Sequence, residues 1–380
     1  MTEQPETPET TETRTTGTET LETPENGTTG TETPEAETTG TETPENGTTE
    51  TETPEAETPG TEATRMGTTG SEATGTEATG TDVIGFIGLG NMGGRIARRL
   101  ADAGRAVLGY DPVAGAAERA GATAAADIAE VARTAGQIFL SLPDDRVVEA
   151  VTFGEGGLLA GVRPGQIVVD LSTSSPASTR RIAAALAARG CDHLDAGISG
   201  GAAAAERGTL TLMVGGAEPV LDRVRPTLEP FAAKVFHMGS SGAGHSAKLL
   251  NNFLNAVSLA ATSEAMVAGR KAGLDPRVLL EVLNSSSGAN WATANRFPHI
   301  VEGDYLEGGL TSTLMIKDVV LYVDHLGDLG VPSLNAAGPL ASFGLAVSLG
   351  YADEISNRVV DAIGDVAGGI RLQELHERNP

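Results

Sequence analysis

The 380-residue chain carries a formal net charge of −25, of which −17 lies in residues 1–80, where nineteen glutamates face two arginines. This negative surplus argues against nucleic-acid and anionic-membrane partners, which attract basic surfaces. The sequence contains no run of about 18 apolar residues, so no membrane span is predicted. The single cysteine, Cys191, excludes an intrachain disulfide. The histidines lack the paired spacing of a metal site, so no metal is predicted.

Residues 1–80 form a low-complexity segment in which Thr-Pro-Glu-Asn-Gly-Thr-Thr and Thr-Pro-Glu-Ala-Glu-Thr alternate. The segment has too few large apolar side chains to offset the entropy of ordering it, so we expect it to be disordered. Its first residues have neither the basic region nor the apolar stretch of a signal peptide, which predicts a cytoplasmic protein. Met66 is an alternative start. Residues 81–380 carry −8, an ordinary charge for an enzyme.

A glycine-rich turn follows the first predicted strand. Asp82-Val-Ile-Gly-Phe-Ile-Gly88 is a short apolar run, and Gly94-Arg-Ile-Ala-Arg-Arg-Leu100 is helical in composition. Between them, Gly88, Gly90 and Gly93 have the Gly-x-Gly-x-x-Gly spacing that lets a backbone turn tightly and approach a pyrophosphate at a helix N-terminus. Strand, glycine turn and helix together predict a dinucleotide-binding fold.

The second predicted strand, Ala106-Val-Leu-Gly-Tyr-Asp111, ends in an acid about twenty residues after the glycines. A carboxylate there binds the adenosine ribose hydroxyls of NAD and repels the 2′-phosphate of NADP, so the spacing favours NAD, with NADP as the alternative. The competing interpretation of Asp111 is an Asp-Pro turn.

Further strands are predicted at Gln137–Leu142, Gln166–Asp170 and Cys191–Asp195, with helices such as Thr179–Ala188 between them. This alternation predicts a doubly wound α/β sheet, which binds ligands at the carboxyl ends of its strands. Loops of polar or small residues are expected there: Leu142-Pro143-Asp144-Asp145, Ser172-Thr173-Ser174-Ser175-Pro176 and Ala196-Gly197-Ile198-Ser199-Gly200-Gly201. Three such loops in succession favour an active-site cleft over plain turns.

Lys248 is one of only four lysines, in a chain where arginine is the usual cation. A lysine can titrate near neutral pH when burial disfavours its charge, whereas arginine stays protonated, so Lys248 is a candidate for proton chemistry. It lies at the glycine-punctuated start of a long helical run, with Asn251, Asn252 and Asn255 on the same predicted face. A solvated helix face is the alternative explanation of this polar stripe.

These motifs, in this order from about Asp82 to the last quarter of the chain, resemble the β-hydroxyacid dehydrogenases, a family that includes 3-hydroxyisobutyrate dehydrogenase and tartronate semialdehyde reductase. The resemblance implies a Rossmann-like domain, a long interdomain helix and an all-α C-terminal domain. We therefore expect residues 1–80 to be a disordered tail, residues 81–240 to be the NAD-binding domain, and residues 241–380 to be the substrate and oligomerisation domain. The resemblance also implies a small hydroxy-acid substrate and a homodimer or homotetramer.

Carried over position by position, the resemblance implies a role for each matching residue. Lys248 would be the catalytic acid/base and Asn252 would orient the substrate beside it. Ser199, Gly200 and Gly201 would hold the substrate carboxylate, Thr173 would lie where nicotinamide meets substrate, and Lys317 would close the site. The cofactor-binding set would be Gly88, Leu89, Gly90, Asn91, Met92, Gly93, Asp111, Leu142, Pro143, Thr173 and Lys317.

Two stretches depart from the family pattern, Gly197 where proline is usual and Gly350–Ser356 where a Gly-x-Gly-x-x-Asp stretch is usual. Asn290, Trp291 and Arg296, in a predicted loop after Ser287, either shape the pocket or pack between helices.

Three alternative functions stay open. They are an imine reductase, which usually lacks the lysine, a decarboxylating 6-phosphogluconate-type dehydrogenase, which needs a larger C-terminal domain and a basic phosphate site, and a non-catalytic nucleotide sensor.

Overall fold

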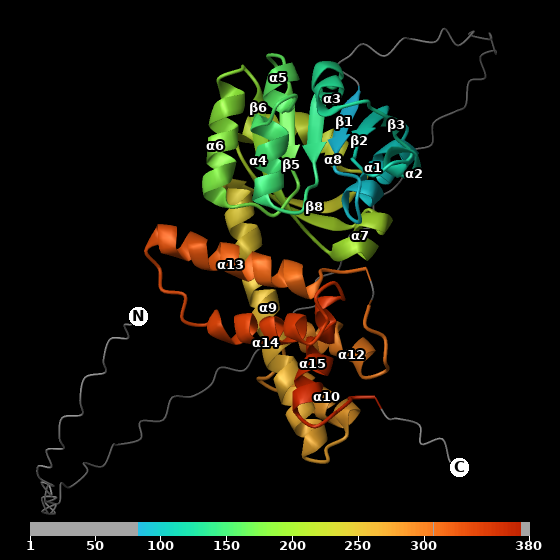
Figure 1. Cartoon of the computed structure of the whole chain (residues 1–380), viewed down its shortest axis with the longest axis vertical. Coiled ribbons are helices and arrows are strands. Elements are labelled where there is room, and N and C mark those ends of the chain that lie inside the picture. Colours follow the sequence, from blue (N-terminus) through green and yellow to red (C-terminus); the bar gives the residue numbers. More distant parts are fainter. Residues whose placement is uncertain (1–82, 307, 374–380) are drawn as a thin grey trace, which may run out of the picture. The chain divides into compact units, whose positions relative to one another are not determined.

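The computed structural model describes residues 83–306 and 308–373 (Figure 1). The segment predicted to be disordered, residues 1–80, lies outside these ranges. Within them, no helix combines the length and the apolar character that crossing a membrane requires.

A single mixed sheet forms the first part of the described chain. Its strands are β1 (Ile84–Ile87), β2 (Val107–Tyr110), β3 (Thr123–Ala124), β4 (Gln137–Leu140), β5 (Ile167–Asp170), β6 (Asp192–Ser199), β7 (Leu210–Gly215) and β8 (Ala232–Gly239). The spatial order is β3-β2-β1-β4-β5-β6-β7-β8, and neighbours are parallel except β6 and β7. The chain runs outward from β1 to β3 and returns to β4 on the other side of β1, which confirms the predicted Rossmann-like topology.

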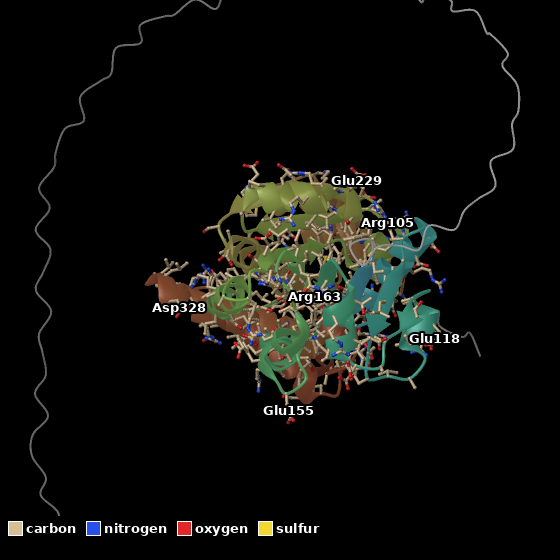
Figure 2. All side chains as sticks on the ribbon, turned by 90° about the horizontal axis from the view of Figure 1, so that it is seen from above. Arg105, Glu118, Glu155, Arg163, Glu229 and Asp328 are labelled. Carbon is tan, nitrogen blue, oxygen red and sulfur yellow. The ribbon has the colours of Figure 1, made fainter. Side chains whose placement is uncertain are left out.

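Helices cover both faces of this sheet (Figure 1). One apolar core takes residues from α1 (Gly93–Asp102), α2 (Ala116–Arg119), α7 (Gly201–Arg207) and α8 (Glu218–Leu228). The other takes residues from α3 (Ile128–Thr134), α4 (Asp145–Phe153), α5 (Leu158–Gly161) and α6 (Pro176–Ala187). The charged side chains labelled in Figure 2 lie outside these cores and are exposed: Arg105, Glu118, Glu155, Arg163, Glu229 and Asp328.

The strands read as continuous apolar runs because both faces of the sheet are buried. Successive side chains point to opposite faces, so Phe86 belongs to the first core and Ile87 to the second. Phe86 stacks on Phe139 of β4 with ring centroids 6.0 Å apart, and Phe139 meets Phe231 edge to face. Short, continuously apolar strands therefore specify a sheet that is buried on both faces.

Strand β6 is longer than its sequence predicts. The prediction ended this strand at Asp195 and placed Ala196–Gly201 in a loop, which is wrong for Ala196–Ser199. These residues pair antiparallel with β7, where Ser199 lies opposite Thr211. The hydrogen bonds that extend β6 come from β7, a strand that lies later in the chain, so the local sequence of β6 does not predict the extension. Ser199 therefore stands at the end of a strand, followed directly by Gly200 and α7.

The second part of the described chain is helical, as predicted. It comprises α9 (Ala243–Lys271), α10 (Pro276–Asn284), α11 (Trp291–Asn295), α12 (Phe297–Ile300), α13 (Ser312–Leu329), α14 (Ala337–Ser348), the short 3₁₀ helix η1 (Ser356–Arg358) and α15 (Val359–Val366). These helices share a third apolar core, in which Phe253 of α9 stacks on Tyr322 of α13 with ring centroids 3.8 Å apart. Helix α9 contacts both this core and strands β6 to β8.

The loop predicted around Asn290 and Trp291 is instead the start of α11. The Asn290 side chain accepts hydrogen bonds from the backbone N–H groups of Ala292 and Thr293, and Thr293 Oγ1 accepts one from the backbone N–H of Asn290, which makes a capping box. A capping box stabilises a helix N-terminus. The small polar residues before Trp291, which resemble a loop in the sequence, therefore lead into a helix.

The N-terminus of α9 is fastened to the sheet by a buried carboxylate. Asp195 of β6, fully buried, accepts hydrogen bonds from the backbone N–H groups of Gly242 (2.8 Å) and His245 (2.9 Å). An aspartate at this place satisfies N–H groups that the helix cannot pair itself and complements the helix dipole. Gly244 lies so close to the sheet that a Cβ there would be 2.4 Å from Met213 O and 2.5 Å from Asp195 O.

We expect Gly244→Ala to lower the free energy of unfolding by about 1–3 kcal/mol, because the added methyl meets backbone that cannot move aside cheaply. Gly344→Ala, in α14, is the matched control, since a Cβ there meets nothing within 4 Å. Alanine should stabilise that helix slightly. Denaturant unfolding of both variants checks the prediction, and equal stability of the two would contradict it.

Candidate active site

The glycine-rich turn joins β1 to α1 and leaves the start of α1 open. Gly88 has φ +90°, a conformation that favours glycine, and a Cβ at Gly90 would meet nothing within 4 Å. Helix α1 has no side-chain cap at Met92 and no acidic residue in its first turn. A helix N-terminus with no side-chain cap and no acid in its first turn is what a pyrophosphate needs, so this turn fits a dinucleotide.

Asp111 follows β2 and is tied to this turn. Its Oδ2 accepts a hydrogen bond from the backbone N–H of Leu89 at 2.7 Å, and its Oδ1 accepts one from Val113 at 2.8 Å. The bond from Val113 is the one expected of an Asp-Pro turn, so the turn that is the competing interpretation of Asp111 is also formed. The first holds the carboxylate beside the glycine turn, where a ribose acceptor is required.

The loops after β4 and β5 are linked to each other and to α13. Leu142 N donates to Ser172 Oγ at 3.0 Å, which joins the two loops. From α13, Lys317 Nζ donates to Pro143 O at 3.0 Å and to Thr173 O at 3.4 Å. Lys317 therefore bridges the sheet and the helical region through backbone carbonyls. From the glycine turn, Asn91 makes a similar bridge, because its Nδ2 donates to Gly308 O at 2.8 Å.

Lys248 lies on α9 against strand β6. A Cβ at Gly197 would be 2.5 Å from Lys248 Cβ, so the lysine stem passes directly over this glycine, two residues before Ser199. Lys248 is half-buried, and no hydrogen bond or ion pair reaches it from the described residues. Burial lowers its pKa to about 8; the Asp318 carboxylate opposes the shift and the Lys317 ammonium adds to it.

Asn252, one turn further along α9, is buried and held by Asp318 of α13. Its Nδ2 donates to Asp318 Oδ2 at 2.5 Å. Asp318 is also buried, and its Oδ1 forms an ion pair with Lys317 Nζ at 3.1 Å. The predicted polar stripe is thus divided, because Asn251 is exposed while Asn252 is not. A solvated face explains only part of the stripe.

Ser199, Gly200 and Gly201 form the turn from β6 into α7. Both glycines have positive φ, +126° and +70°, and both are exposed. Ser199 Oγ makes no hydrogen bond within the described ranges. The turn thus has a free hydroxyl and unshielded backbone beside the stem of Lys248, which suits a carboxylate.

The structure brings most of the predicted residues into one connected region. Contacts run from the glycine turn through Leu142 and Thr173 to Lys317, and from there to Asn252, Lys248 and the β6 end. Sequence reasoning gave no role to Asp318, which joins three of these groups. The signal was present, since an acid interrupts the apolar run Leu314-Met-Ile-Lys-Asp318-Val-Val. Arg296 contacts η1 at Ser356 and Asn357, next to the stretch that departs from the family pattern.

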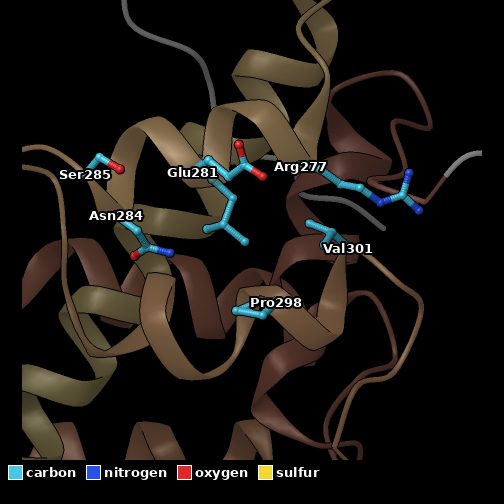
Figure 3. A pocket seen from close by; sticks show the side chains of 7 residues that line it. Arg277, Glu281, Asn284, Ser285, Pro298 and Val301 are labelled. Atoms are coloured by element: carbon cyan, nitrogen blue, oxygen red, sulfur yellow. The ribbon is translucent and has the colours of Figure 1, made fainter.

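A separate hollow lies between α10 and α12 (Figure 3). It has a volume of about 530 Å³ and is open to solvent. Its lining residues are Arg277, Leu280, Glu281, Asn284, Ser285, Pro298 and Val301. None of them belongs to the connected region around Lys248, so this hollow is not a candidate for the chemistry.

Comparison with known proteins identifies the family. Residues 83–239 match the family described as the NAD binding domain of 6-phosphogluconate dehydrogenase, and residues 242–359 match that described as NAD-binding of NADP-dependent 3-hydroxyisobutyrate dehydrogenase. The 2-(hydroxymethyl)glutarate dehydrogenase of Eubacterium barkeri is 37% identical over 276 residues, which cover 71% of this chain and 91% of that enzyme. The chain belongs to the β-hydroxyacid dehydrogenase family.

Two further relatives agree with this family. The NAD-dependent L-serine dehydrogenase of Pseudomonas aeruginosa is 39% identical over 280 residues, 71% of this chain and 94% of that enzyme. A solved structure, Mycobacterium tuberculosis 3-hydroxyisobutyrate dehydrogenase with L-serine, has a TM-score of 0.67 at 33% identity and covers 74% of this chain and 98% of its own. This β-hydroxyacid dehydrogenase is therefore an oxidoreductase that acts on CH–OH groups with NAD(P).

We expect Lys248→Met to raise stability at pH 7, because the site disfavours the lysine's charge. The folded-state pKa of about 8 lies below the ordinary value of 10.5, so the wild type is penalised below pH 8 and recovers stability as pH rises towards 10.5. The gain at pH 7 should be about 1–3 kcal/mol and should shrink at pH 10. Denaturant unfolding at both pH values measures it, and a loss of stability at pH 7 would contradict the prediction.

Proposed function

We propose that this protein interconverts a small β-hydroxy acid and its aldehyde or keto acid, with NAD as the preferred cofactor and Lys248 as the acid/base. The observation that carries the proposal is the position of Lys248, whose stem packs on Gly197 two residues before Ser199, and burial there lowers its pKa to about 8. A group with a pKa near the working pH can both accept and release a proton during turnover. Bound NAD(P) supplies the hydride acceptor for oxidation and the hydride donor for reduction.

In this mechanism the turn at Ser199, Gly200 and Gly201 binds the substrate carboxylate. The Ser199 hydroxyl and the glycine N–H groups then fix the hydroxyl of the substrate beside Lys248 Nζ. During oxidation the neutral amine takes the hydroxyl proton as the C=O bond forms. During reduction the ammonium stabilises the developing alkoxide and then donates its proton to that oxygen.

Asn252, Thr173 and Lys317 complete the proposed site. Asp318 accepts from Asn252 Nδ2, which fixes the amide plane and leaves its second N–H for the substrate. Lys317 draws the loops after β4 and β5 towards α13, and we assign Thr173 to the junction of nicotinamide and substrate. The cofactor would lie along Gly88 to Gly93 and the loop at Leu142 and Pro143.

The alternative functions explain fewer of these observations. Imine reductases usually lack the lysine, and here a lysine stands at the β6 end. A 6-phosphogluconate-type enzyme would need a basic cluster for phosphate, whereas Lys317 is the cation whose charge acts on Lys248 among the described residues. A nucleotide sensor would have no need of an acid/base lysine with a lowered pKa.

We also propose the domain division at residue 240, a cytoplasmic location and a homodimer or homotetramer assembled through residues 241–380. The boundary is supported by the end of β8 at Gly239 and the start of α9 at Ala243. The assembly is supported by exposed apolar side chains in this region, including Leu254 (65%) and Leu334 (81%).

Lys248→Arg should keep the charge but lower kcat by at least ~100-fold, because a guanidinium does not release its proton. In the wild type, kcat/KM for oxidation should rise with pH through about 8, since the neutral amine is the form that accepts the proton. Lys271→Arg is the matched control, an exposed lysine at the far end of α9. A folded Lys248→Arg enzyme with near wild-type kcat would remove Lys248 from the mechanism.

NAD should be used with higher kcat/KM than NADP, because the Asp111 carboxylate repels a 2′-phosphate. Asp111→Asn removes the charge and keeps one acceptor oxygen, enough for either Leu89 N–H or Val113 N–H, so it should reduce the NAD/NADP ratio by at least ~10-fold at the cost of one hydrogen bond in the turn. Steady-state kinetics with both cofactors measure the ratio. A wild-type preference for NADP would show that Asp111 is not the ribose ligand.

A further inference from the structure

Arg296 is a desolvated cation that stands where α11 meets α12. Its Nη2 donates to Asn255 Oδ1 at 3.2 Å, and its Nη1 donates to Asn357 Oδ1 and to Ser356 Oγ. The Trp291 ring lies 5.2 Å from the guanidinium carbon. Burial lowers the pKa of Arg296 to about 10. Among these contacts, all the partners are neutral.

No carboxylate forms an ion pair with Arg296 within the described residues, which distinguishes it from Arg358 and Arg371 of the helical region. Arg358 pairs with Asp361, and Arg371 pairs with Asp365. A guanidinium has five N–H donors, and three of those on Arg296 are used in these contacts. The Nε–H and one N–H of Nη2 are left, two donors on a rigid planar group that suits a carboxylate or another oxyanion.

The neighbours of Arg296 place it on the same helix face as the proposed acid/base. Asn255 is seven residues beyond Lys248 on α9, so the two side chains project from the same face about 10 Å apart along the axis. Asn252 stands between them, and its partner Asp318 is already paired with Lys317. Asn357 and Ser356 are both buried, at 1% and 0% exposure, so the far end of this stripe is a built polar site.

We propose that Arg296, with Asn255 and Asn357, binds a second anionic group of the substrate, so that the enzyme acts on hydroxy acids with two acidic groups. This inference rests on the proposed function, in which the first carboxylate binds at Ser199. About 10 Å of helix axis between Lys248 and Asn255 is short enough for one small substrate to reach both ends of the stripe. A second carboxylate on a side chain of one or two methylenes is the smallest group that would extend from a hydroxyl beside Lys248 towards Arg296.

The competing explanation is that Arg296 only joins α9, α11 and η1 as a packing contact. A packing role predicts that loss of the guanidinium lowers stability and affects every substrate alike. An anion site predicts that the loss affects only substrates with the second charge, and that it acts mainly on KM. The two roles are therefore separable by kinetics.

The test is a substrate series that differs only in the distal group. 3-Hydroxyisobutyrate has a methyl there, 2-(hydroxymethyl)succinate and 2-(hydroxymethyl)glutarate have a carboxylate on one or two methylenes, and the 5-amide of the glutarate has the same shape without charge. We expect at least one of the two dicarboxylates to show a kcat/KM at least ~10-fold above both the methyl and the amide compound, the scale of hydrogen bonds to a charged group.

Arg296→Gln should lower kcat/KM for the preferred dicarboxylate by about 10–100-fold, chiefly through KM, and leave 3-hydroxyisobutyrate within about threefold. Arg296→Lys should recover part of the effect, because it keeps the charge but loses the planar fork. Arg277→Gln, an exposed arginine of α10 that pairs with Glu302, is the matched control and should change neither substrate. An equal loss for all substrates in Arg296→Gln would overturn the proposal in favour of packing.

Direct binding separates this inference from the proposed chemistry. Glutarate has two carboxylates and no hydroxyl to oxidise, and in the presence of NAD it should bind the wild type about 10–100-fold more tightly than Arg296→Gln by calorimetry. If glutarate binds the wild type more tightly than Arg296→Gln while no hydroxy acid is oxidised, the anion site stands and the proposed function fails. If 3-hydroxyisobutyrate is oxidised but charge at the distal position has no effect on kcat/KM or Kd, the anion site alone is wrong.

Discussion

The active-site region depends on one buried carboxylate, that of Asp195, which joins the sheet to α9. It accepts hydrogen bonds from Gly242 and His245, the N–H groups with which α9 begins. A buried carboxylate is costly unless it is fully hydrogen-bonded, and a helix N-terminus supplies both donors and favourable dipole charge. Because Lys248 follows within one turn, this contact sets the position of the lysine relative to Ser199 on the same strand. Glycines at positions 197 and 244 allow the helix to lie close enough for that register.

The same closeness sets the charge state of the lysine. Desolvation disfavours the ammonium, and only Asp318 opposes it, while Lys317 adds a like charge. Asp318 is in contact with Asn252 and Lys317 and not with Lys248, on which it acts only through its charge. Burial therefore outweighs this attraction and leaves the pKa of Lys248 at about 8. The geometry that would hold the substrate in the proposed site therefore also lowers the pKa of the proposed acid/base.

The sequence predicted the elements whose signals are local. The glycine turn, the strand that ends at Asp111 and the helix that begins before Lys248 each depend on residues within a few positions, and the structure has all three. The features that were missed depend on partners far along the chain. Strand β6 continues to Ser199 because β7 pairs with it, and Asn252 is buried because Asp318, 66 residues later, accepts its N–H. No spacing rule within a segment shows such contacts, although an acid inside an apolar helix hints at one.

Helix α9 carries both ends of the proposed substrate site, and its rigidity separates the two tasks. The lysine end is fixed by Asp195 and the close glycine contacts with β6, whereas the Asn255 end is fixed by α11, α12 and η1 through Arg296. Two turns of helix keep the span between them constant, so the distal contacts can change without moving the proton-transfer group. Substitutions at the Arg296 end would then alter which acid binds while the chemistry at Lys248 stays the same. Under the proposed mechanism, that division would let one scaffold serve several hydroxy acids with a single lysine.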